Sequence, residues 1–210
     1  MYPVIAQYPI MKLAAITASH HRVAGVDEAG RGPLAGPVVV AAVMLPARYT
    51  LEGLDDSKRL TRELRESLFP AIQQQAISFT IVEVDIDEIE QLNILGATLT
   101  GMKRAVQTLK PAPTLALVDG NRAPELNCEV HTIIEGDHWV PAISAASILA
   151  KVTRDKIMLQ MHEKYPGYGF DRNKGYPTPE HLRCLKELGP CPIHRKTFAP
   201  VRDVLEPRLL

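Results

Sequence analysis

Four acidic side chains stand where short apolar runs of this chain end. Asp27 and Glu28 end the first run, Asp119 ends the fourth, and Asp137 comes just past the fifth. Functional groups of open α/β sheets gather at strand ends, so we expect these four carboxylates to converge. Converging carboxylates raise one another's pKa unless a cation lies between them, and oxygen ligands without His or Cys suit Mg²⁺ or Mn²⁺. A single acid at a strand end is more commonly a turn or N-cap residue, so the prediction of a metal centre depends on the set of four.

The glycine-rich segment 30–36 has the look of a nucleotide-binding loop but fits neither common motif. In a dinucleotide fingerprint the third glycine would come one position before Gly36, and a helix would follow where this chain has an apolar strand-like run. Gly25 and Gly30 have P-loop spacing, but Arg31 and Gly32 stand where Lys and Ser or Thr are needed. The sequence therefore argues against nucleotide binding.

Two histidines and two cysteines near the C-terminal end have a spacing that could close a zinc site. The set is His181, Cys184, Cys191 and His194. The alternative, which we favour, places His181 and Cys184 on a helix and the other two in a Pro-rich loop. There the cysteines act as small hydrophobic side chains.

Two further features have simpler interpretations. Residues 83–90 hold five carboxylates that alternate with Val and Ile, which predicts a strand end and a helix start with a solvated face. Trp139 is expected to be a surface or rim aromatic.

The elements that must position these residues follow from apolar periodicity and turn residues. Apolar runs at 23–27, 37–45, 77–84, 114–119 and 129–134 predict five strands. Helices are predicted from the possible N-cap residues 55–57 to about 75, from the acidic cluster to before Pro111, from 143 to about 165, and at 179–188. This order predicts a mixed α/β sheet with helices gathered toward the C-terminal end. We expect an N-terminal arm over residues 1–21, too weakly apolar for a signal peptide, and one domain over 22–210.

Composition narrows the class of protein. The chain has 210 residues, 46% of them hydrophobic, and 24 basic against 24 acidic residues, which excludes disordered and collagen-like proteins. Three irregularly spaced cysteines suit a reducing cytoplasm, and no apolar run approaches a membrane span. A zero net charge argues at first sight against nucleic acid as a partner. However, residues 1–100 hold 8 basic and 12 acidic residues, and residues 101–210 hold 16 and 12, so the C-terminal half can supply a basic surface.

Taken in order, six motifs strongly resemble bacterial ribonuclease HII, of the type 2 ribonuclease H family, over about residues 22–200. They are Val-Ala-Gly-Val-Asp27-Glu28-Ala-Gly30-Arg31-Gly32-Pro-Leu-Ala-Gly-Pro, Leu-Asp-Asp-Ser57-Lys58-Arg-Leu, Val-Asp119-Gly-Asn, Gly-Asp137, Ile-Ser-Ala-Ala-Ser-Ile-Leu-Ala-Lys151-Val and Lys174-Gly-Tyr176-Pro-Thr. The resemblance implies a ribonuclease H-like fold, with a mixed five-stranded sheet flanked by helices and a C-terminal helical extension.

The resemblance also implies an activity. It is that of an endonuclease that cuts the RNA strand of RNA–DNA hybrids and cuts 5′ of single ribonucleotides embedded in duplex DNA, leaving 5′-phosphate and 3′-hydroxyl ends. In the family, the acids that match Asp27, Glu28, Asp119 and Asp137 hold two divalent ions, Mn²⁺ or Mg²⁺, for two-metal-ion catalysis. Two bound divalent ions would raise the formal net charge from zero to +4.

Substrate contacts are implied residue by residue. Gly30, Arg31 and Gly32 match the segment that contacts the RNA-to-DNA junction, where glycines let the backbone approach a ribose 2′-hydroxyl. A plain inter-strand turn is the alternative for this segment. Tyr176 matches the tyrosine that packs on the deoxyribose after the ribonucleotide, although a buried loop aromatic has the same spacing. Ser57 and Lys58 match phosphate contacts, and Ser57 would also suit a helix N-cap.

Several basic residues could line a track for a nucleic-acid duplex. They are Lys151, Arg154, Lys174, Arg195 and Lys196, each of which could equally be a solvated surface charge.

The chain departs from the relatives' pattern at His138-Trp139-Val140-Pro141-Ala142 and at Asn173, which puts the shape of the loop after Asp137 in question. Proline at the start of the following helix should be tolerated.

The leading hypothesis is a monomeric, metal-dependent endoribonuclease whose partners are RNA–DNA hybrids and ribonucleotide-containing duplex DNA, with no membrane partner. A non-catalytic hybrid-binding module is the alternative from another class, but binding alone has no use for four carboxylates. A magnesium-dependent phosphatase would share the acids and leave the Gly-Arg-Gly segment and Tyr176 unexplained.

Overall fold

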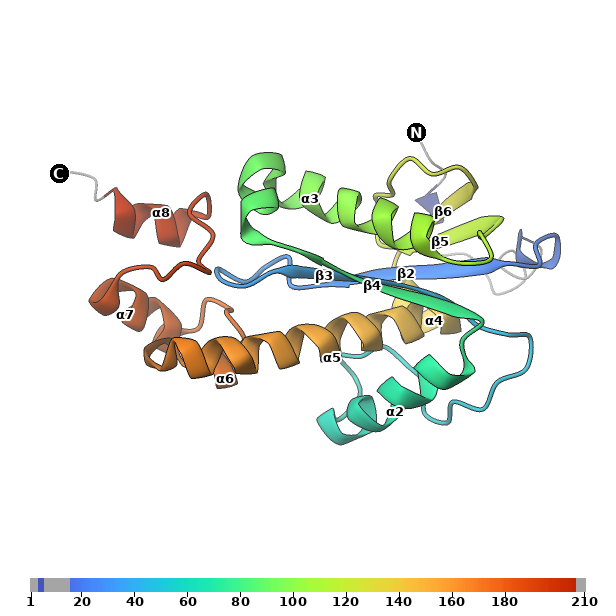
Figure 1. The fold of residues 1–210 in the computed structure, drawn as a ribbon, viewed down its shortest axis with the longest axis horizontal. Coiled ribbons are helices and arrows are strands. Elements are labelled where there is room, and N and C mark those ends of the chain that lie inside the picture. Colours follow the sequence, from blue (N-terminus) through green and yellow to red (C-terminus); the bar gives the residue numbers. More distant parts are fainter. Residues whose placement is uncertain (1–3, 6–15, 207–210) are drawn as a thin grey trace.

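The computed structural model describes residues 4–5 and 16–206, which form a twisted sheet covered by helices on both faces (Figure 1). Five strands lie in the order β6-β5-β2-β3-β4. Their bounds are Val23–Ala29 for β2, Val38–Met44 for β3, Ser78–Val84 for β4, Leu115–Asp119 for β5 and Glu129–Ile133 for β6. β2, β5 and β6 are parallel, whereas β3 runs antiparallel to both β2 and β4. The mixed five-stranded sheet predicted from the sequence is confirmed.

A short strand, β1, lies within the predicted N-terminal arm. Its two residues, Val4–Ile5, pair in parallel with Thr132 and Ile133 of β6 and extend the sheet at that edge. The rest of the arm lies outside the described residues, apart from 16–21.

The helices are α2 (Arg62–Gln75), α3 (Ile86–Thr108), α4 (Gly136–Trp139), α5 (Pro141–Lys164), the short 3₁₀ helix η1 (Pro166–Tyr168), α6 (Phe170–Asn173), α7 (Pro179–Leu188) and α8 (Ala199–Leu205). The predicted start of α2 at residues 55–57 is wrong. Its N-cap is Thr61, whose Oγ1 accepts a hydrogen bond from the Leu64 amide at 3.3 Å. Pro141 occupies the first turn of α5, as expected, and α8 was not predicted.

The two faces of the sheet carry separate apolar cores. Ala24 and Val26 of β2 belong to the core beneath α3, and β3 supplies alternate residues to both faces. On the other face α5 packs directly onto β2, because a β-carbon built on Gly25 would lie 2.1 Å from the carbonyl carbon of Ala142. This close approach brings the start of α5, and the acid that precedes it, beside the end of β2.

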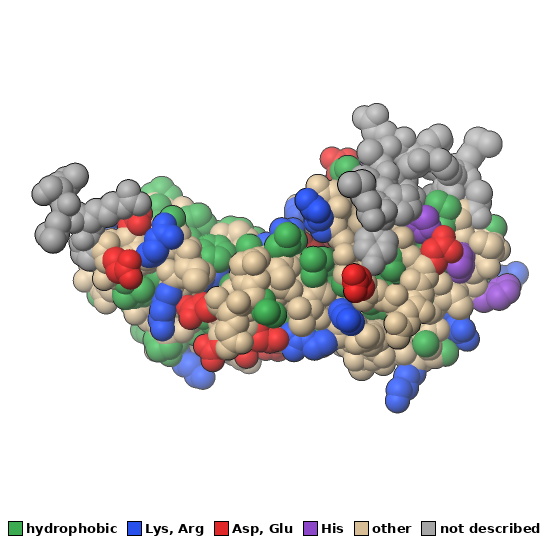
Figure 2. All heavy atoms as spheres, turned by 90° about the horizontal axis from the view of Figure 1, so that it is seen from above, with side chains coloured by type: hydrophobic (Ala, Val, Ile, Leu, Met, Phe, Trp, Pro, Cys, Tyr) green, Lys and Arg blue, Asp and Glu red, His purple; other side chains and the backbone are tan. Residues whose placement is uncertain are grey.

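Helices α6, α7 and α8 form the predicted C-terminal helical extension, at the end of α5 away from α4 (Figure 1). In the space-filling view the molecule is elongated, and its upper outline is hollowed between its two ends (Figure 2). No helix in the described part of the chain is long and apolar enough to cross a membrane.

Candidate metal-dependent active site

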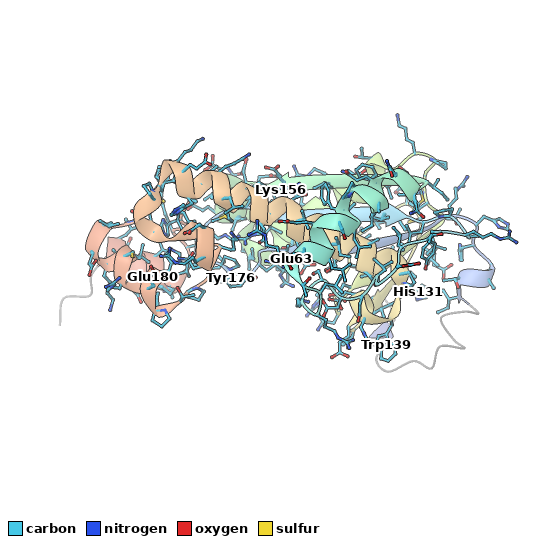
Figure 3. The ribbon with its side chains drawn as sticks, turned by 90° about the horizontal axis from the view of Figure 1, so that it is seen from below. Glu63, His131, Trp139, Lys156, Tyr176 and Glu180 are labelled. Carbon is cyan, nitrogen blue, oxygen red and sulfur yellow. The ribbon has the colours of Figure 1, made fainter. Side chains whose placement is uncertain are left out.

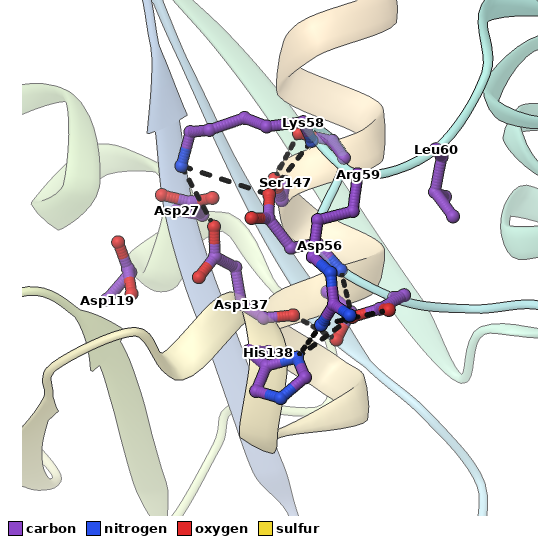
Figure 4. Close-up of polar contacts among 12 residues, drawn as sticks. Asp27, Asp56, Lys58, Arg59, Leu60, Asp119, Asp137, His138 and Ser147 are labelled. Carbon is purple, nitrogen blue, oxygen red and sulfur yellow. Dashed lines mark hydrogen bonds and ion pairs between the residues drawn. The ribbon is translucent and has the colours of Figure 1, made fainter.

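Three of the four predicted acids meet in one cluster. Asp27 lies on β2, Asp119 ends β5, and Asp137 lies in α4, and one carboxylate oxygen from each falls within 4.8 Å of the others. Their side chains face one another in the close-up of Figure 4. Within the described residues, this is the one group of three or more His, Cys, Asp or Glu side chains placed to share a metal ion. The predicted convergence of these three acids is therefore confirmed.

The backbone around the cluster holds two of these carboxylates in place. The Glu28 amide donates to Asp27 Oδ1 at 2.7 Å, and the Gly136 amide donates to Asp119 Oδ1 at 2.8 Å. The carbonyl of Asp137 accepts a 2.7 Å hydrogen bond from the Ser144 hydroxyl on α5. The start of α4 is thus tied to the end of β5 on one side and to α5 on the other.

The carboxylates of the cluster repel one another when no cation lies between them. Burial raises the pKa of Asp27 well above its usual range, and the charges of Glu28 and Asp119 raise it further. Burial also raises the pKa of Asp119 and of Asp137, despite backbone hydrogen bonds to the first and a Lys58 hydrogen bond to the second. All ligand atoms here are carboxylate oxygens, and a cation between them would relieve their repulsion. This set suits a hard divalent cation such as Mg²⁺ or Mn²⁺.

Glu28 lies beside this cluster rather than in it. Side chains alternate along a strand, so Asp27 faces α5 while Glu28 faces α3, where it lines a small cavity with Leu95 and Met102. Burial raises the pKa of Glu28, although Arg31, 3.4 Å from Oε1, opposes the shift. Asp119 of the cluster lines that small cavity as well. Glu28, the fourth acid, therefore borders the acid cluster from the face of the sheet that α3 covers.

Lys58 is the cation that the structure places against the cluster. Its Nζ lies 3.0 Å from Asp137 Oδ2 and 3.9 Å from Asp56 Oδ1 (Figure 4). Partial burial alone would lower the pKa of Lys58, but the hydrogen bond and charge of Asp137 outweigh it and raise the pKa. The ammonium group thus shares a carboxylate with any metal ion bound there.

The unusual segment after Asp137 is held by the loop that carries Lys58. Arg59 Nη1 lies 2.6 Å from His138 Nδ1 and 3.4 Å from Asp55 Oδ2, so residues 55–59 and α4 are bound together (Figure 4). Trp139 is 53% exposed, which confirms the predicted surface aromatic. The departures at 138–142 therefore leave Asp137 in the acid cluster.

A cleft of about 500 Å³ joins the acids to most of the predicted substrate contacts. Its walls include Asp27, Glu28, Asp119, Gly30, Arg31, Gly32, Ser57, Lys58, Lys151 and Tyr176. Ser57 is buried, and its Oγ lies 2.6 Å from Ser147 Oγ of α5, so its predicted helix N-cap role is wrong. Ser147 and Arg65 also line the cleft. Sequence reasoning assigned neither a role: Arg65 lies outside the six motifs, and Ser147 lies within the Ile143–Val152 motif, whose helical pattern does not show which of its serines faces the cleft.

Tyr176 and the Gly-Arg-Gly segment lie next to each other on the wall of this cleft. The tyrosine is 43% exposed, and a β-carbon built on Gly32 would lie 3.7 Å from its ring. Gly30 has φ +98°, and a β-carbon there would overlap the Arg154 side chain, so only glycine fits. Tyr176 and Trp139 lie along the same edge of the molecule (Figure 3).

Asn173, the second departure, has a structural role next to Tyr176. Its Nδ2 donates to the Tyr168 carbonyl at 2.7 Å, and its Oδ1 accepts from the Gly175 amide at 2.8 Å. Asparagine therefore satisfies the turn that leads into Tyr176.

The structure removes two residues from the predicted duplex track, and for the others the track stays a prediction. Arg154 and Arg195 are 1% and 0% exposed and bind backbone carbonyls, so the expectation that they contact a duplex is wrong. Lys151 lines the cleft and pairs with Asp155 at 2.7 Å. Lys174 lies instead in a neighbouring cleft of about 370 Å³, and burial lowers its pKa. Lys196 is exposed.

The four-residue zinc site is not formed. His181 and Cys184 lie on α7, and the Nε2 atoms of His181 and His194 are 3.0 Å apart. Cys191 Sγ lies 3.1 Å from His194 Nδ1, on the ring nitrogen opposite the one that faces His181. The favoured alternative, a helix followed by a Pro-rich loop, is confirmed.

Comparison with known proteins agrees with this geometry. The profile of the family described as Ribonuclease HII matches residues 24–201. The chain belongs to the ribonuclease HII family. It is 54% identical over 184 residues to Ribonuclease HII of Burkholderia ambifaria, which is 88% of this chain and 85% of that protein. Ribonuclease HII of Burkholderia mallei is also 54% identical, over 88% of this chain and 86% of that protein.

Solved structures show the same fold. The ribonuclease H2 of Pyrococcus horikoshii OT3 superposes with a TM-score of 0.73 and 30% identity, over 87% of this chain and 96% of that one. The Archaeoglobus fulgidus RNase HII solved in complex with PCNA gives a TM-score of 0.67 and 27% identity, over 84% and 95%. Membership in the ribonuclease HII family makes this chain a metal-dependent ribonuclease H, which hydrolyses RNA in RNA–DNA hybrids.

Proposed function

We propose that this enzyme also cuts duplex DNA on the 5′ side of a single embedded ribonucleotide, leaving 5′-phosphate and 3′-hydroxyl ends. The observation that carries the proposal is the shared cleft. Asp27, Glu28 and Asp119 line one part of it, with Asp137 next to them in the acid cluster, and the Gly30–Gly32 segment and Tyr176 line another part. One nucleotide step can therefore be bound by its sugar and by its phosphate at the same time.

The metal-binding part of the proposal assigns Asp27, Asp119 and Asp137, with Glu28, to two divalent ions, Mg²⁺ or Mn²⁺. Such ions, when bound, lower the pKa of an attacking water and stabilise the leaving 3′-oxygen. The carboxylates hold and orient the ions and neutralise part of their charge. Lys58 and Ser57, which lie before α2, hold the phosphate from the wall of the cleft. Lys151 and Lys174 add positive charge along the path of the duplex.

The recognition part of the proposal assigns the ribose to Gly30, Arg31 and Gly32 and the following deoxyribose to Tyr176. Glycine backbone can approach a 2′-hydroxyl closely, and that hydroxyl is what distinguishes RNA from DNA. An aromatic ring packed on the next sugar leaves little room for a second 2′-hydroxyl. The combination favours a ribonucleotide followed by a deoxyribonucleotide.

We infer that the enzyme acts as a monomer in the cytoplasm. All four acids and the recognition segment come from one chain, so the cleft needs no second copy. Cys128, Cys184 and Cys191 are free thiols, which suits a reducing compartment.

The proposal is tested by mapping cuts in a DNA duplex that carries one ribonucleotide, with Mg²⁺ or Mn²⁺ present. We expect one cut, 5′ of the ribonucleotide, and a product whose new 5′ end is phosphorylated. Tyr176→Ala should lower the preference for this substrate over a uniform RNA–DNA hybrid, while Tyr176→Phe, which keeps the ring, should retain it. A wild type that cuts the hybrid but leaves the single-ribonucleotide duplex intact would show that the proposal is wrong.

A further inference from the structure

The segment 193–195 lies directly behind the surface assigned to substrate recognition. The Gly36 amide donates to the Ile193 carbonyl at 2.9 Å, and the Arg195 amide donates to the Leu34 carbonyl at 2.8 Å. The Leu34 amide in turn donates to the Gly175 carbonyl at 2.8 Å. Three stretches that are far apart in the sequence are thus hydrogen-bonded into one unit.

The buried guanidinium of Arg195 binds the Gly-Arg-Gly segment from behind. Its Nη2 donates to the Gly30 carbonyl at 2.6 Å and its Nη1 to the Arg31 carbonyl at 2.9 Å. Nε and Nη2 also donate to the Gly36 carbonyl, at 3.0 and 2.7 Å. In a trans peptide the N–H points away from the C=O, so the amides of Arg31 and Gly32 are turned away from Arg195. Two adjacent N–H donors on a cleft wall suit a hydroxyl or phosphate oxygen.

A histidine pair connects the same segment to Tyr176. His181 Nδ1 lies 2.9 Å from the Tyr176 carbonyl, which can only accept, so this nitrogen carries the proton. Neutral His181 then accepts at Nε2 from His194 Nε2–H, 3.0 Å away. His194 Nδ1 accepts from the Cys191 amide at 3.0 Å, which completes a consistent set of tautomers. Burial lowers the pKa of both rings, that of His194 to about 4, so both stay neutral near pH 7.

Arg195 is a buried cation without an anionic partner among the described residues. No ion pair between described residues involves Arg195 or Arg154. Burial, with the nearby charge of Arg154, lowers the pKa of Arg195 to about 9, which still leaves it protonated near neutral pH. Backbone carbonyls and the Phe198 ring, whose centroid lies 5.1 Å from Cζ, offset the charge in place of an anion. Burying a cation without an anion is costly to stability, and we take this cost as support for a functional role.

We propose that Arg195 and the His181–His194 pair are positioning residues for substrate selectivity. Arg195 aims the Arg31 and Gly32 amides into the cleft, and the histidine pair fixes the backbone of Tyr176 next to them. Together they set the distance between the ribose contact and the deoxyribose contact. This inference rests on the proposed function, because it explains how the junction preference is built.

The test compares variants that remove these bonds with variants that restore or spare them. Arg195→Met and His181→Ala remove the contacts, Arg195→Lys keeps the charge, and His181→Asn keeps an N–H near the position of Nδ1. Leu185→Ala is the control, because Leu185 is buried on α7 and its loss destabilises the same region without removing a hydrogen bond from the recognition surface. The readouts are kcat/KM on the single-ribonucleotide duplex and on the uniform hybrid, and amide hydrogen exchange of residues 30–36 and 174–178.

We expect Arg195→Met and His181→Ala to lower the ratio of the two kcat/KM values by about tenfold, the scale of one or two lost hydrogen bonds. Arg195→Lys and His181→Asn should recover part of the ratio. Exchange should accelerate at 30–36 in Arg195→Met and at 174–178 in His181→Ala. Leu185→Ala should leave the ratio within about threefold of wild type, a range smaller than the loss expected above.

Unchanged ratios and unchanged exchange in Arg195→Met and His181→Ala would overturn the inference, as would an equal loss of ratio in Leu185→Ala. A wild type without any junction preference would overturn the proposed function instead. In that case the exchange data alone still decide whether Arg195 and His181 position these segments.

Discussion

The carboxyl group of Asp27 is buried in the cleft next to other carboxylates. Its pKa is raised well above the usual range by burial and then by Glu28 and Asp119. Removing the charge should therefore stabilise the metal-free fold. We predict that Asp27→Asn raises the metal-free unfolding free energy at neutral pH by about 1 kcal/mol, a size common for active-site trade-offs. This corresponds to roughly 2–4 °C in Tm, measured by thermal unfolding in EDTA.

Asp203→Asn is the matched control, because Asp203 is exposed on α8, away from the cleft. It should leave Tm nearly unchanged. A lower Tm in Asp27→Asn than in wild type would contradict the proposed repulsion among the acids.

Lys58 and a divalent ion compete for the same carboxylate. Lys58 Nζ lies 3.0 Å from Asp137 Oδ2, and most of its side chain is exposed. An ion pair with one exposed partner contributes up to about 1 kcal/mol, which corresponds to roughly fivefold in the Kd of a metal ion that must displace it. We predict that Lys58→Ala tightens Mg²⁺ or Mn²⁺ binding by up to about fivefold, by calorimetry, and raises KM for the nucleic acid. Lys164→Ala, at the exposed C-terminal end of α5, serves as the control, and weaker metal binding in Lys58→Ala would refute the competition.

Single residues also show where sequence reasoning reached its limit. The acids could be predicted because each stands at the end of an apolar run, a local signal. The burial of Arg154 and Arg195 could not, because arginine is usually exposed and their carbonyl partners lie 117 to 165 residues away in the chain. Only the folded chain brings those carbonyls together.

At the scale of elements, the contact of β2 with α5 sets the spacing of the acid cluster. A β-carbon on Gly25 would lie 2.1 Å from the Ala142 carbonyl carbon, an overlap with rigid backbone. We predict that Gly25→Ala destabilises the protein by about 3 kcal/mol, at the upper end of ordinary overpacking, or roughly 6–12 °C in Tm. Gly167→Ala is the control, since its β-carbon would meet only the flexible end of Leu188. Equal Tm values for the two variants would show that the contact is not limiting.

The ends of helices and strands could be predicted where the apolar pattern and turn residues of the sequence agree with the tertiary packing. The strand runs of β3 and β5 are buried on both faces, so their apolar character is continuous and their ends are sharp. The start of α2 was misplaced because residues 55–59 have N-cap composition but are held in a loop by tertiary contacts. Lys58 binds Asp137 there, and Ser57 contacts Ser147. Such contacts leave no trace in local propensity.

For the whole molecule, the cluster couples metal binding to pH. The raised carboxyl pKa values mean that the folded state binds protons more tightly than the unfolded chain, from the ordinary carboxyl range up to the raised values. Unfolding releases protons in this window, so metal-free stability falls as pH rises through it. Protons compete with the metal, so Mg²⁺ stabilisation should grow over the same window. Thermal unfolding against pH, with EDTA or with Mg²⁺, measures both trends. Parallel curves in the two conditions would contradict the coupling.

The net charge of the chain is zero, but its acidic and basic side chains are gathered in different places. Three of its acids are gathered in one cluster, and cations such as Lys58 and Lys151 line the cleft beside them. The composition alone therefore gave a misleading indication about nucleic acid as partner, whereas the ordered motifs indicated it correctly. Sequence reasoning singled out the acids and the Gly30–Gly32 segment, but not the buried contacts that Arg195, His181 and His194 make behind that segment and Tyr176.

The central claim is that the Asp27, Asp119 and Asp137 cluster is the hydrolytic centre for ribonucleotides in duplex DNA. The most direct measurement is the single-turnover cleavage rate of a 5′-labelled DNA duplex with one ribonucleotide and Mg²⁺, for wild type, Asp27→Asn and Asp203→Asn. We predict one cut 5′ of the ribonucleotide by wild type and Asp203→Asn. The Asp27→Asn rate should be lower by about 10³-fold, the upper end of losses on removing one transition-state stabiliser. An intact strand with wild type, or a wild-type rate with Asp27→Asn, would contradict the account.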